Sequence, residues 1–205
     1  HMIQHMMLAL AIPILLVFSR PLTMAKSIQK DNPEFLGPID WYVSAHKSRF
    51  WMFMTKPMNL VAFSFISYIG IYFTPLFGWL MSGHWGHFAM QLYLLNYGYA
   101  LMWRVIGIDG ATDGVSKDQI FLLLITEPIH IVFGITLLLS SNIVGESMYL
   151  IIDRPYLQDL AHDQKVGGVL SLVIGEILIA LILMHLVRSK NQDANPIGQL
   201  RQHNL

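Results

Sequence analysis

The chain has 205 residues, of which 54% are hydrophobic and 13% are charged, and its formal net charge is zero. Soluble domains carry about 25% charged residues, so this composition, with a mean hydropathy of +0.50, is typical of a multi-pass membrane protein. The neutral charge balance gives no reason to expect nucleic acid as a partner. The absence of cysteine excludes disulfides, thiolate metal sites and CxxC redox chemistry.

Five segments approach or reach the length of about 20 apolar residues that a helix needs to cross a bilayer. In chain order they are His1–Phe18, Pro57–Met81, His84–Ile106, Gln119–Ser140 and Val166–Val187. The connection 19–56 ends in IDWYVSAHKSRFWMFM, whose mixture of aromatic and basic residues predicts one helix lying in the membrane interface. We therefore predict an all-α, polytopic transmembrane bundle over residues 1–188, and a disordered cytoplasmic tail over residues 189–205.

The distribution of Lys and Arg predicts the orientation of this bundle. If the five helices alternate in direction, eleven basic residues fall on one side: Arg20, Lys26, Lys30, Lys47, Arg49, Lys56, Arg104, Lys117, Arg188, Lys190 and Arg201. The other side keeps Arg154 and Lys165. Cytoplasmic loops carry the excess of Lys and Arg, so the rich side is predicted to be cytoplasmic, together with the C-terminus. The expected location is the plasma membrane.

This topology gathers histidine and methionine at the outer membrane surface. The candidate metal ligands are His1, His5, His84, His87, Met2, Met6 and Met90. The spacings of four residues in the first histidine pair and three in the second place each pair on one helix face. Imidazole and thioether groups together suit copper, and Cu(I) in particular. Asp163, just before the last helix on the same side, is a candidate to orient one imidazole.

The same residues have a simpler interpretation, because histidine and tryptophan are common at helix ends in membranes and methionine is a common filler of apolar helices. Deeper polar residues are harder to explain in this way. His130 and Glu176 each lie about 15 Å below the outer surface, at 1.5 Å of rise per residue. A carboxylate at that depth must be neutral, paired or beside a cavity. A hydrogen bond between His130 and Glu176 would satisfy both groups, either as a structural clamp between two helices or as a functional pair.

No enzyme signature occurs in the sequence. HExxH, a glycine-rich phosphate loop and a nucleophile elbow are all absent. We therefore expect no catalytic residues and no enzyme activity.

Several segments resemble, in order, the membrane-integral CtaG family of cytochrome c oxidase assembly factors. They are HMIQHMMLALAIPILLVFSRPL, YFTPLFGWLM, HWGHFAMQLYLLNYGYALMWRVIGID, EPIHIVFGITLLLSSNIVG and DLAHDQKVGGVLSLVIGEI. The sequences of these motifs are most similar to those of actinobacterial members, which are often fused behind a CopD-like copper-resistance domain. The resemblance implies that His1 and Met2 belong to the natural protein and that further helices precede this C-terminal portion. One departure is Arg104, where relatives usually carry proline, so the inner end of that helix is expected to pack differently.

The resemblance implies a role in maturing the oxidase, with copper delivered on the outer side. The expected partners are oxidase subunits or copper chaperones, the lipid bilayer, and a fused or adjacent CopD-like domain. Two alternatives stay open at this point. The midplane pair suggests a copper transport permease, and histidines on the first and third helices could instead hold heme.

Overall fold

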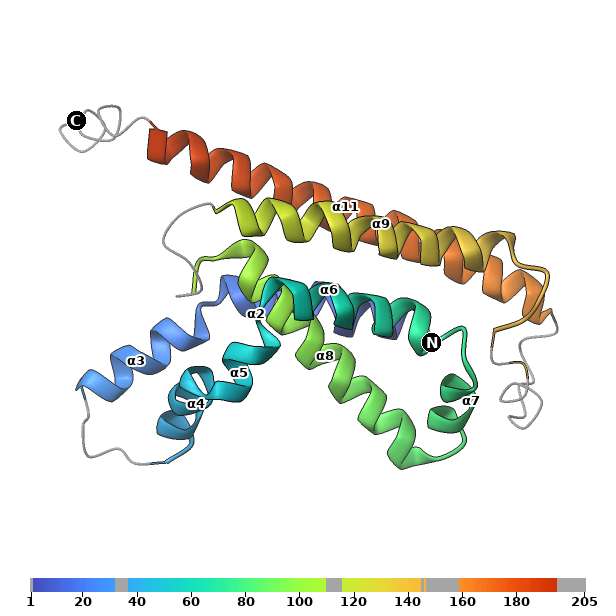
Figure 1. The fold of residues 1–205 in the computed structure, drawn as a ribbon, viewed down its shortest axis with the longest axis horizontal. Coiled ribbons are helices and arrows are strands. Elements are labelled where there is room, and N and C mark those ends of the chain that lie inside the picture. The colour runs from blue at the N-terminus through green and yellow to red at the C-terminus, as the bar shows by residue number, and fades with distance from the viewer. Residues whose placement is uncertain (1, 32–36, 110–115, 145, 147–158, 195–205) are drawn as a thin grey trace.

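The chain folds entirely into helices and their connections over the residues that the structure describes (Figure 1). The structure, a computed structural model, describes residues 2–31, 37–109, 116–144, 146 and 159–194. No β-strand occurs in these ranges. The all-α fold predicted from the sequence is confirmed. The predicted tail lies mostly outside the described residues, although the last helix continues to Ala194.

The N-terminal helix is continuous from α1 (Met2–Met6) through a π-helical segment η1 (Met7–Ala11) to α2 (Ile12–Phe18). The helix is then interrupted at Arg20, whose φ of 51° is outside the right-handed helical region. A further helix, α3 (Pro21–Asp31), begins directly after the break, although the sequence analysis did not anticipate it. Pro21 suits this position because the first residue of a helix needs no N–H donor.

The segment predicted as one helix from Pro57 to Met81 is broken, which corrects that prediction. It consists of α6 (Pro57–Phe65), the π-helical segment η2 (Ile66–Gly70) and α7 (Pro75–Met81), with a bend of 80° between the two parts. Pro75 lacks the N–H that would continue the helix, and it forces the residue before it into an extended conformation. Thr74 adopts that conformation and caps α7, because its hydroxyl accepts from the N–H of Leu76 at 3.3 Å.

The predicted interfacial helix is also two helices, α4 (Pro38–Lys47) and α5 (Arg49–Met54). Ser48 separates them because its extended backbone ends α4, and its hydroxyl then accepts from the N–H of Trp51 at 3.1 Å to cap α5. A serine that offers an N-cap commonly starts a new helix. The aromatic and basic composition that predicted an interfacial location is shared by both pieces.

The remaining helices lie where they were predicted: α8 (His84–Ile106) has the predicted bounds, α9 (Lys117–Leu139) nearly so, and α11 (Leu160–Ala194) extends beyond Val166–Val187 at both ends. Helices α9 and α11 run side by side along the long axis of the molecule, and α8 crosses obliquely beneath them (Figure 1). Close approach of α9 and α11 depends on Gly168, because a Cβ there would lie 2.9 Å from the carbonyl oxygen of Gly134.

The number of membrane spans differs from the predicted five. Among the described residues, three helices are long and apolar enough to cross a membrane, namely Ile3–Asp31, Lys117–Leu139 and Leu160–Lys190. The bent pair Pro57–Gly70 and Pro75–Met81 could provide a fourth span. Helix α8 is not among them, although its 23 residues make it long enough. The exact count of five spans and one interfacial helix is therefore not confirmed.

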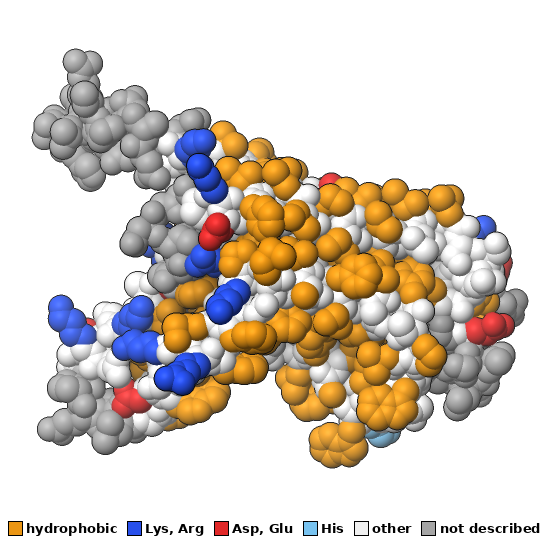
Figure 2. All heavy atoms as spheres, in the orientation of Figure 1, with side chains coloured by type: hydrophobic (Ala, Val, Ile, Leu, Met, Phe, Trp, Pro, Cys, Tyr) orange, Lys and Arg blue, Asp and Glu red, His pale blue; other side chains and the backbone are white. Residues whose placement is uncertain are grey.

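Lys and Arg residues gather at one end of the molecule. Figure 2 shows Lys and Arg side chains at the end that holds α3, α4 and α5, whereas hydrophobic side chains cover the middle. We call this the basic end, and its exposed members are Arg20, Lys26, Lys30, Lys47, Arg49, Lys56, Lys117, Arg188 and Lys190. The opposite end holds α7, the start of α8, the end of α9 and the start of α11 (Figure 1). The candidate metal ligands that are described lie toward this opposite end.

Candidate functional site

His5 and His87 are brought together from two helices that are far apart in the sequence. His5 lies in α1 and is buried, and His87 lies in the first turns of α8 and is half-buried. Their ring centroids are 6.4 Å apart. The approach of the two helices is possible because Gly98 of α8 lies directly against η1, where a Cβ would overlap the carbonyl oxygen of Ala9. The sequence predicted that the histidine pairs of the first and third predicted helices lie at the same end of the bundle. In the structure one histidine of each pair, His5 and His87, lies beside the other.

The imidazole of His5 is held by Tyr72, a residue that the sequence analysis missed. The Nδ1 atom of His5 forms a buried hydrogen bond with the hydroxyl of Tyr72. Tyr72 follows η2 and is fixed by stacking on Phe77 and by a tilted contact with Phe133, at ring-centroid distances of 5.1 and 4.8 Å. When Nδ1 is engaged in this way, Nε2 is the atom of His5 that is suited to a metal.

His87 is oriented by Gln91, one turn further along α8. The side-chain amide nitrogen of Gln91 lies 3.1 Å from Nε2 of His87. Gln91 was also missed by the sequence analysis, although its position four residues after a candidate ligand was a usable signal. Met90 is buried on this part of α8, whereas His84 is exposed at the first position of the helix. The two histidines of the second pair therefore have different environments.

The other predicted ligands are distributed unequally. Met6 is buried, but its sulfur accepts a hydrogen bond from the hydroxyl of Ser171 at 3.5 Å, so it faces α11 and not His87. Met2 lies in α1, but its side chain is outside the described part of the structure. His1 lies outside the described residues altogether. Of the predicted ligands whose side chains are described, His5 and His87 are the two whose rings lie close together. Met90 is on the same helix, three residues after His87.

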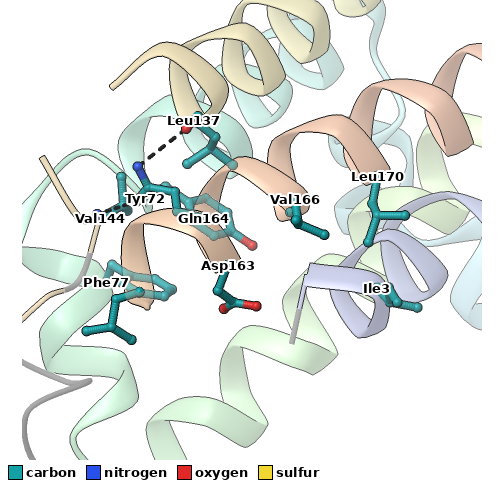
Figure 3. A pocket seen from close by; sticks show the side chains of 11 residues that line it. Ile3, Tyr72, Phe77, Leu137, Val144, Asp163, Gln164, Val166 and Leu170 are labelled. Atoms are coloured by element: carbon teal, nitrogen blue, oxygen red, sulfur yellow. Dashed lines mark hydrogen bonds between the residues drawn. The ribbon is translucent and has the colours of Figure 1, made fainter. Parts of the chain in front are cut away.

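A cavity of about 130 Å³ lies next to Tyr72, between α1, α7, α9 and α11. Figure 3 shows the carboxylate of Asp163 directed into this space. The neighbouring Gln164 ties the start of α11 to the end of α9, because it donates to the carbonyl of Leu137 at 3.3 Å and accepts from the N–H of Val144 at 2.7 Å. Asp163 therefore lines the same cavity as Tyr72, the residue that holds His5. Among the described residues, no imidazole contacts Asp163.

A second polar cluster lies in the middle of α9 and α11. The hydrogen bond predicted between His130 and Glu176 is not among those of the described residues. Instead, Nδ1 of His130 lies 3.5 Å from a carboxylate oxygen of Glu127, and one carboxylate oxygen of Glu176 lies within 4.8 Å of both residues. Glu127 thus joins the two residues that the sequence paired in one cluster. Nε2 of His130 lies 3.1 Å from the hydroxyl of Ser171.

The fold and these clusters define an all-helical membrane protein with two buried histidines, a group of carboxylates on α9 and α11, and one strongly basic end. Over residues 1–191 the chain matches the family described as cytochrome c oxidase caa3 assembly factor (Caa3_CtaG). The chain belongs to this family, as the resemblance of its motifs implied.

Three mycobacterial proteins are similar to the chain. They are uncharacterised proteins of Mycobacterium bovis, Mycobacterium tuberculosis and Mycobacterium leprae, and each is 33% identical over 190 to 192 residues. The aligned region covers 91% of this chain but only 29% of each relative, so the chain spans less than a third of their length. No solved structure matches the chain.

Proposed function

We propose that this chain is the membrane part of a cytochrome c oxidase assembly factor, and that it binds copper at the end of the bundle opposite the basic end. The family supports the assembly role, and the juxtaposition of His5 and His87 is the observation that carries the copper proposal. The expected partners are oxidase subunits or copper chaperones within or beside the plasma membrane. The proposed role is to hold or relay copper, with no catalytic step.

The separation of the two rings is suited to one shared ion. With metal–nitrogen bonds of about 2.0 Å and about 1.1 Å from nitrogen to ring centre, two imidazoles on one ion have centroids at most about 6.3 Å apart. The observed 6.4 Å matches the linear arrangement, which Cu(I) accepts with two ligands. A third, soft ligand would draw the rings closer. Met90 is the described candidate for that position, and Met2 and His1 are candidates outside the described side chains.

Tyr72 and Gln91 support the proposal because metal-binding histidines normally engage their second nitrogen in a hydrogen bond. Tyr72 engages Nδ1 of His5 and directs Nε2 to the ion. Gln91 engages Nε2 of His87. With the amide turned so that its oxygen accepts from that nitrogen, Nδ1 of His87 becomes the ligand atom.

The proposal is tested by competing a coloured Cu(I) chelator with the full natural protein purified in detergent. We expect His5→Ala and His87→Ala each to weaken Cu(I) binding by more than the roughly 10-fold that loss of an outer-shell partner costs. The double variant should be little worse than either single one, because a two-ligand site already fails when half is lost.

His84→Ala is the matched control, since it removes the same side chain one turn earlier on the same helix, at an exposed position. It should change Cu(I) affinity by less than about 3-fold. Oxidase activity in cells should follow the same order, with partial rescue by added copper. If the His5→Ala/His87→Ala protein keeps its copper and supports full oxidase activity, the two residues are interfacial histidines and the copper proposal is wrong.

A further inference from the structure

The geometry points to a second metal site, inside the membrane, formed by Glu127, His130 and Glu176. We propose that it binds a divalent first-row cation such as Mn²⁺, Fe²⁺ or Zn²⁺. This inference does not depend on copper binding by His5 and His87, and it concerns harder ligands at a different depth. One ligand atom from each of the three residues lies within 4.8 Å of the other two.

The spacing of the ligand atoms is close to that of a bound ion. Glu127 and His130 are three residues apart on α9, so they share one helix face, and Glu176 reaches them from α11. Nδ1 of His130 and a carboxylate oxygen of Glu127 are 3.5 Å apart. Two ligand atoms at bonds of about 2.1 Å in a tetrahedral site lie about 3.4 Å from each other. Only a small movement of Glu176 is then needed to complete three ligands.

Charge balance favours a dication at this place. Glu127 lies ten residues after Lys117 and twelve before Leu139, the two ends of α9, so it is near the middle of a candidate span. On α11 the nearest basic residues to Glu176 are Lys165 and Arg188, at least eleven residues away along the helix. Two carboxylates that face each other in an apolar span must share a proton or a cation. A divalent cation with one neutral imidazole neutralises both.

The hydrogen bonds of His130 leave a lone pair on Nδ1, the nitrogen that faces Glu127. A thioether sulfur only accepts, so the contact from Ser171 to Met6 uses the single hydroxyl proton of Ser171. The oxygen of Ser171 then accepts from Nε2–H of His130, at 3.1 Å. This arrangement fixes the tautomer in which Nδ1 carries a lone pair, and Nδ1 faces Glu127. Metal-binding histidines are oriented in this way by the partner of their other nitrogen.

The residues around His130 leave a small cavity beside the cluster and a backbone surface against which the imidazole packs. A small cavity of about 10 Å³, bordered by Tyr68, Thr126, Glu127 and His130, is close to the minimum that holds one water. Gly175, next to Glu176, allows the imidazole to lie on the backbone of α11, because a Cβ there would come within 3.0 Å of Nδ1. Tyr68 of η2 packs against the ring with centroids 5.3 Å apart. Two carboxylates and one imidazole favour Mn²⁺, Fe²⁺ or Zn²⁺ over Cu(I), which prefers sulfur and nitrogen.

The test uses the full natural protein in detergent with His5→Ala and His87→Ala already present, so that the copper-binding residues cannot contribute. Mn²⁺ is added and free Mn²⁺ is measured by its electron paramagnetic resonance signal. We expect one Mn²⁺ to bind per chain and to be displaced by Zn²⁺. Glu176→Gln, Glu127→Gln and His130→Gln should each weaken binding at least about 10-fold, and Ser171→Ala should do so too through the tautomer of His130.

Two matched controls accompany these variants. Glu146→Gln removes an exposed carboxylate, and His185→Gln removes a histidine of α11 that packs on Phe18. Neither should change Mn²⁺ binding. Glu176 is exposed on α11, so its glutamine variant should keep the melting temperature and the Cu(I) affinity of the protein that retains His5 and His87. The proposal is overturned if 1 mM Mn²⁺ or Zn²⁺ does not bind, or if Glu176→Gln binds them with unchanged affinity.

Discussion

Asp109 shows how one residue can fix the junction between distant segments. It is fully buried, and its two carboxylate oxygens accept from the N–H groups of Leu22 and Thr23 at 2.9 and 2.8 Å, and from the Thr23 hydroxyl at 2.8 Å. The first N–H groups of a helix have no partner within the helix. Asp109 therefore caps α3 from a position more than eighty residues later in the chain.

We predict that Asp109→Ala destabilises the protein by about 2–4 kcal/mol, because it leaves buried donors unsatisfied. Asp109→Asn should cost less, since it keeps one acceptor oxygen. Asp118→Asn is the control: its bond to Arg104 is 3.1 Å long but 53% of the Asp118 side chain is exposed, so its loss should cost less than about 1 kcal/mol. Unfolding in increasing dodecyl sulfate measures the three values, and equal midpoints for the Asp109 and Asp118 variants would contradict the capping role.

At the level of helices, the sequence was informative where the apolar pattern is long and unbroken. The start of α8 at His84 follows from the preceding Gly83, and α9 and α11 follow from their length and apolarity. Local breaks were less predictable. Pro75 is a signal for the break before α7, but the apolar pattern over Pro57–Met81 predicted one continuous helix. Helix α3 was missed although Pro21 is a start signal, and its cap, Asp109, is a tertiary contact that the local sequence does not show.

The candidate site residues were also predicted only in part, because the local sequence does not show contacts between helices. Spacing placed His87 and His5 on favourable faces, but spacing within one helix does not show which histidine faces a neighbouring helix. Burial of His5 and exposure of His84 depend on how η1 and α2 pack against α8 and how α1 packs against α11. Tyr72 and Ser171 were missed because each acts across a helix interface.

Packing of η1 against α8 gives a prediction at this scale. A Cβ at Gly98 would overlap the carbonyl oxygen of Ala9 and lie 2.8 Å from Cγ of Pro13, and neither atom can move without shifting a helix. Gly98→Ala should therefore destabilise the bundle by about 1–3 kcal/mol and weaken Cu(I) binding, since His87 is carried away from His5.

Gly83→Ala is the control, because no atom lies within 4 Å of the Cβ that it would add. Gly83 is closer in sequence to His87 than Gly98 is, yet its replacement should leave the copper affinity unchanged. The chelator competition described above measures both variants. Unaltered affinity in a folded Gly98→Ala protein would mean that the distance between α1 and α8 does not control the copper site.

For the whole molecule, the separation of the basic end from the end that holds His5 and His87 predicts an orientation of the bundle in the membrane. Exposed Lys and Arg residues of α3, α4, α5 and the end of α11 occupy one end (Figure 2), and His5, His87 and Asp163 lie toward the other. Because positive residues are retained in the cytoplasm, the structure favours an outward position for the histidines. Copper that is delivered to an oxidase from the outer side would then reach them without crossing the membrane.

This orientation can be measured directly, because the chain has no cysteine, so a cysteine introduced into it is unique once any cysteines outside this chain are replaced by serine. Ser82 and Ser141 are exposed at the histidine-bearing end, and Ser44 is exposed on α4 at the basic end. In intact cells, an impermeant maleimide should label Ser82→Cys and Ser141→Cys of the full natural protein, whereas Ser44→Cys should react only after permeabilisation. Labelling of Ser44→Cys alone in intact cells would reverse the orientation. His5 and His87 would then face the cytoplasm, and the proposed copper site would have to be loaded from the cytoplasmic pool.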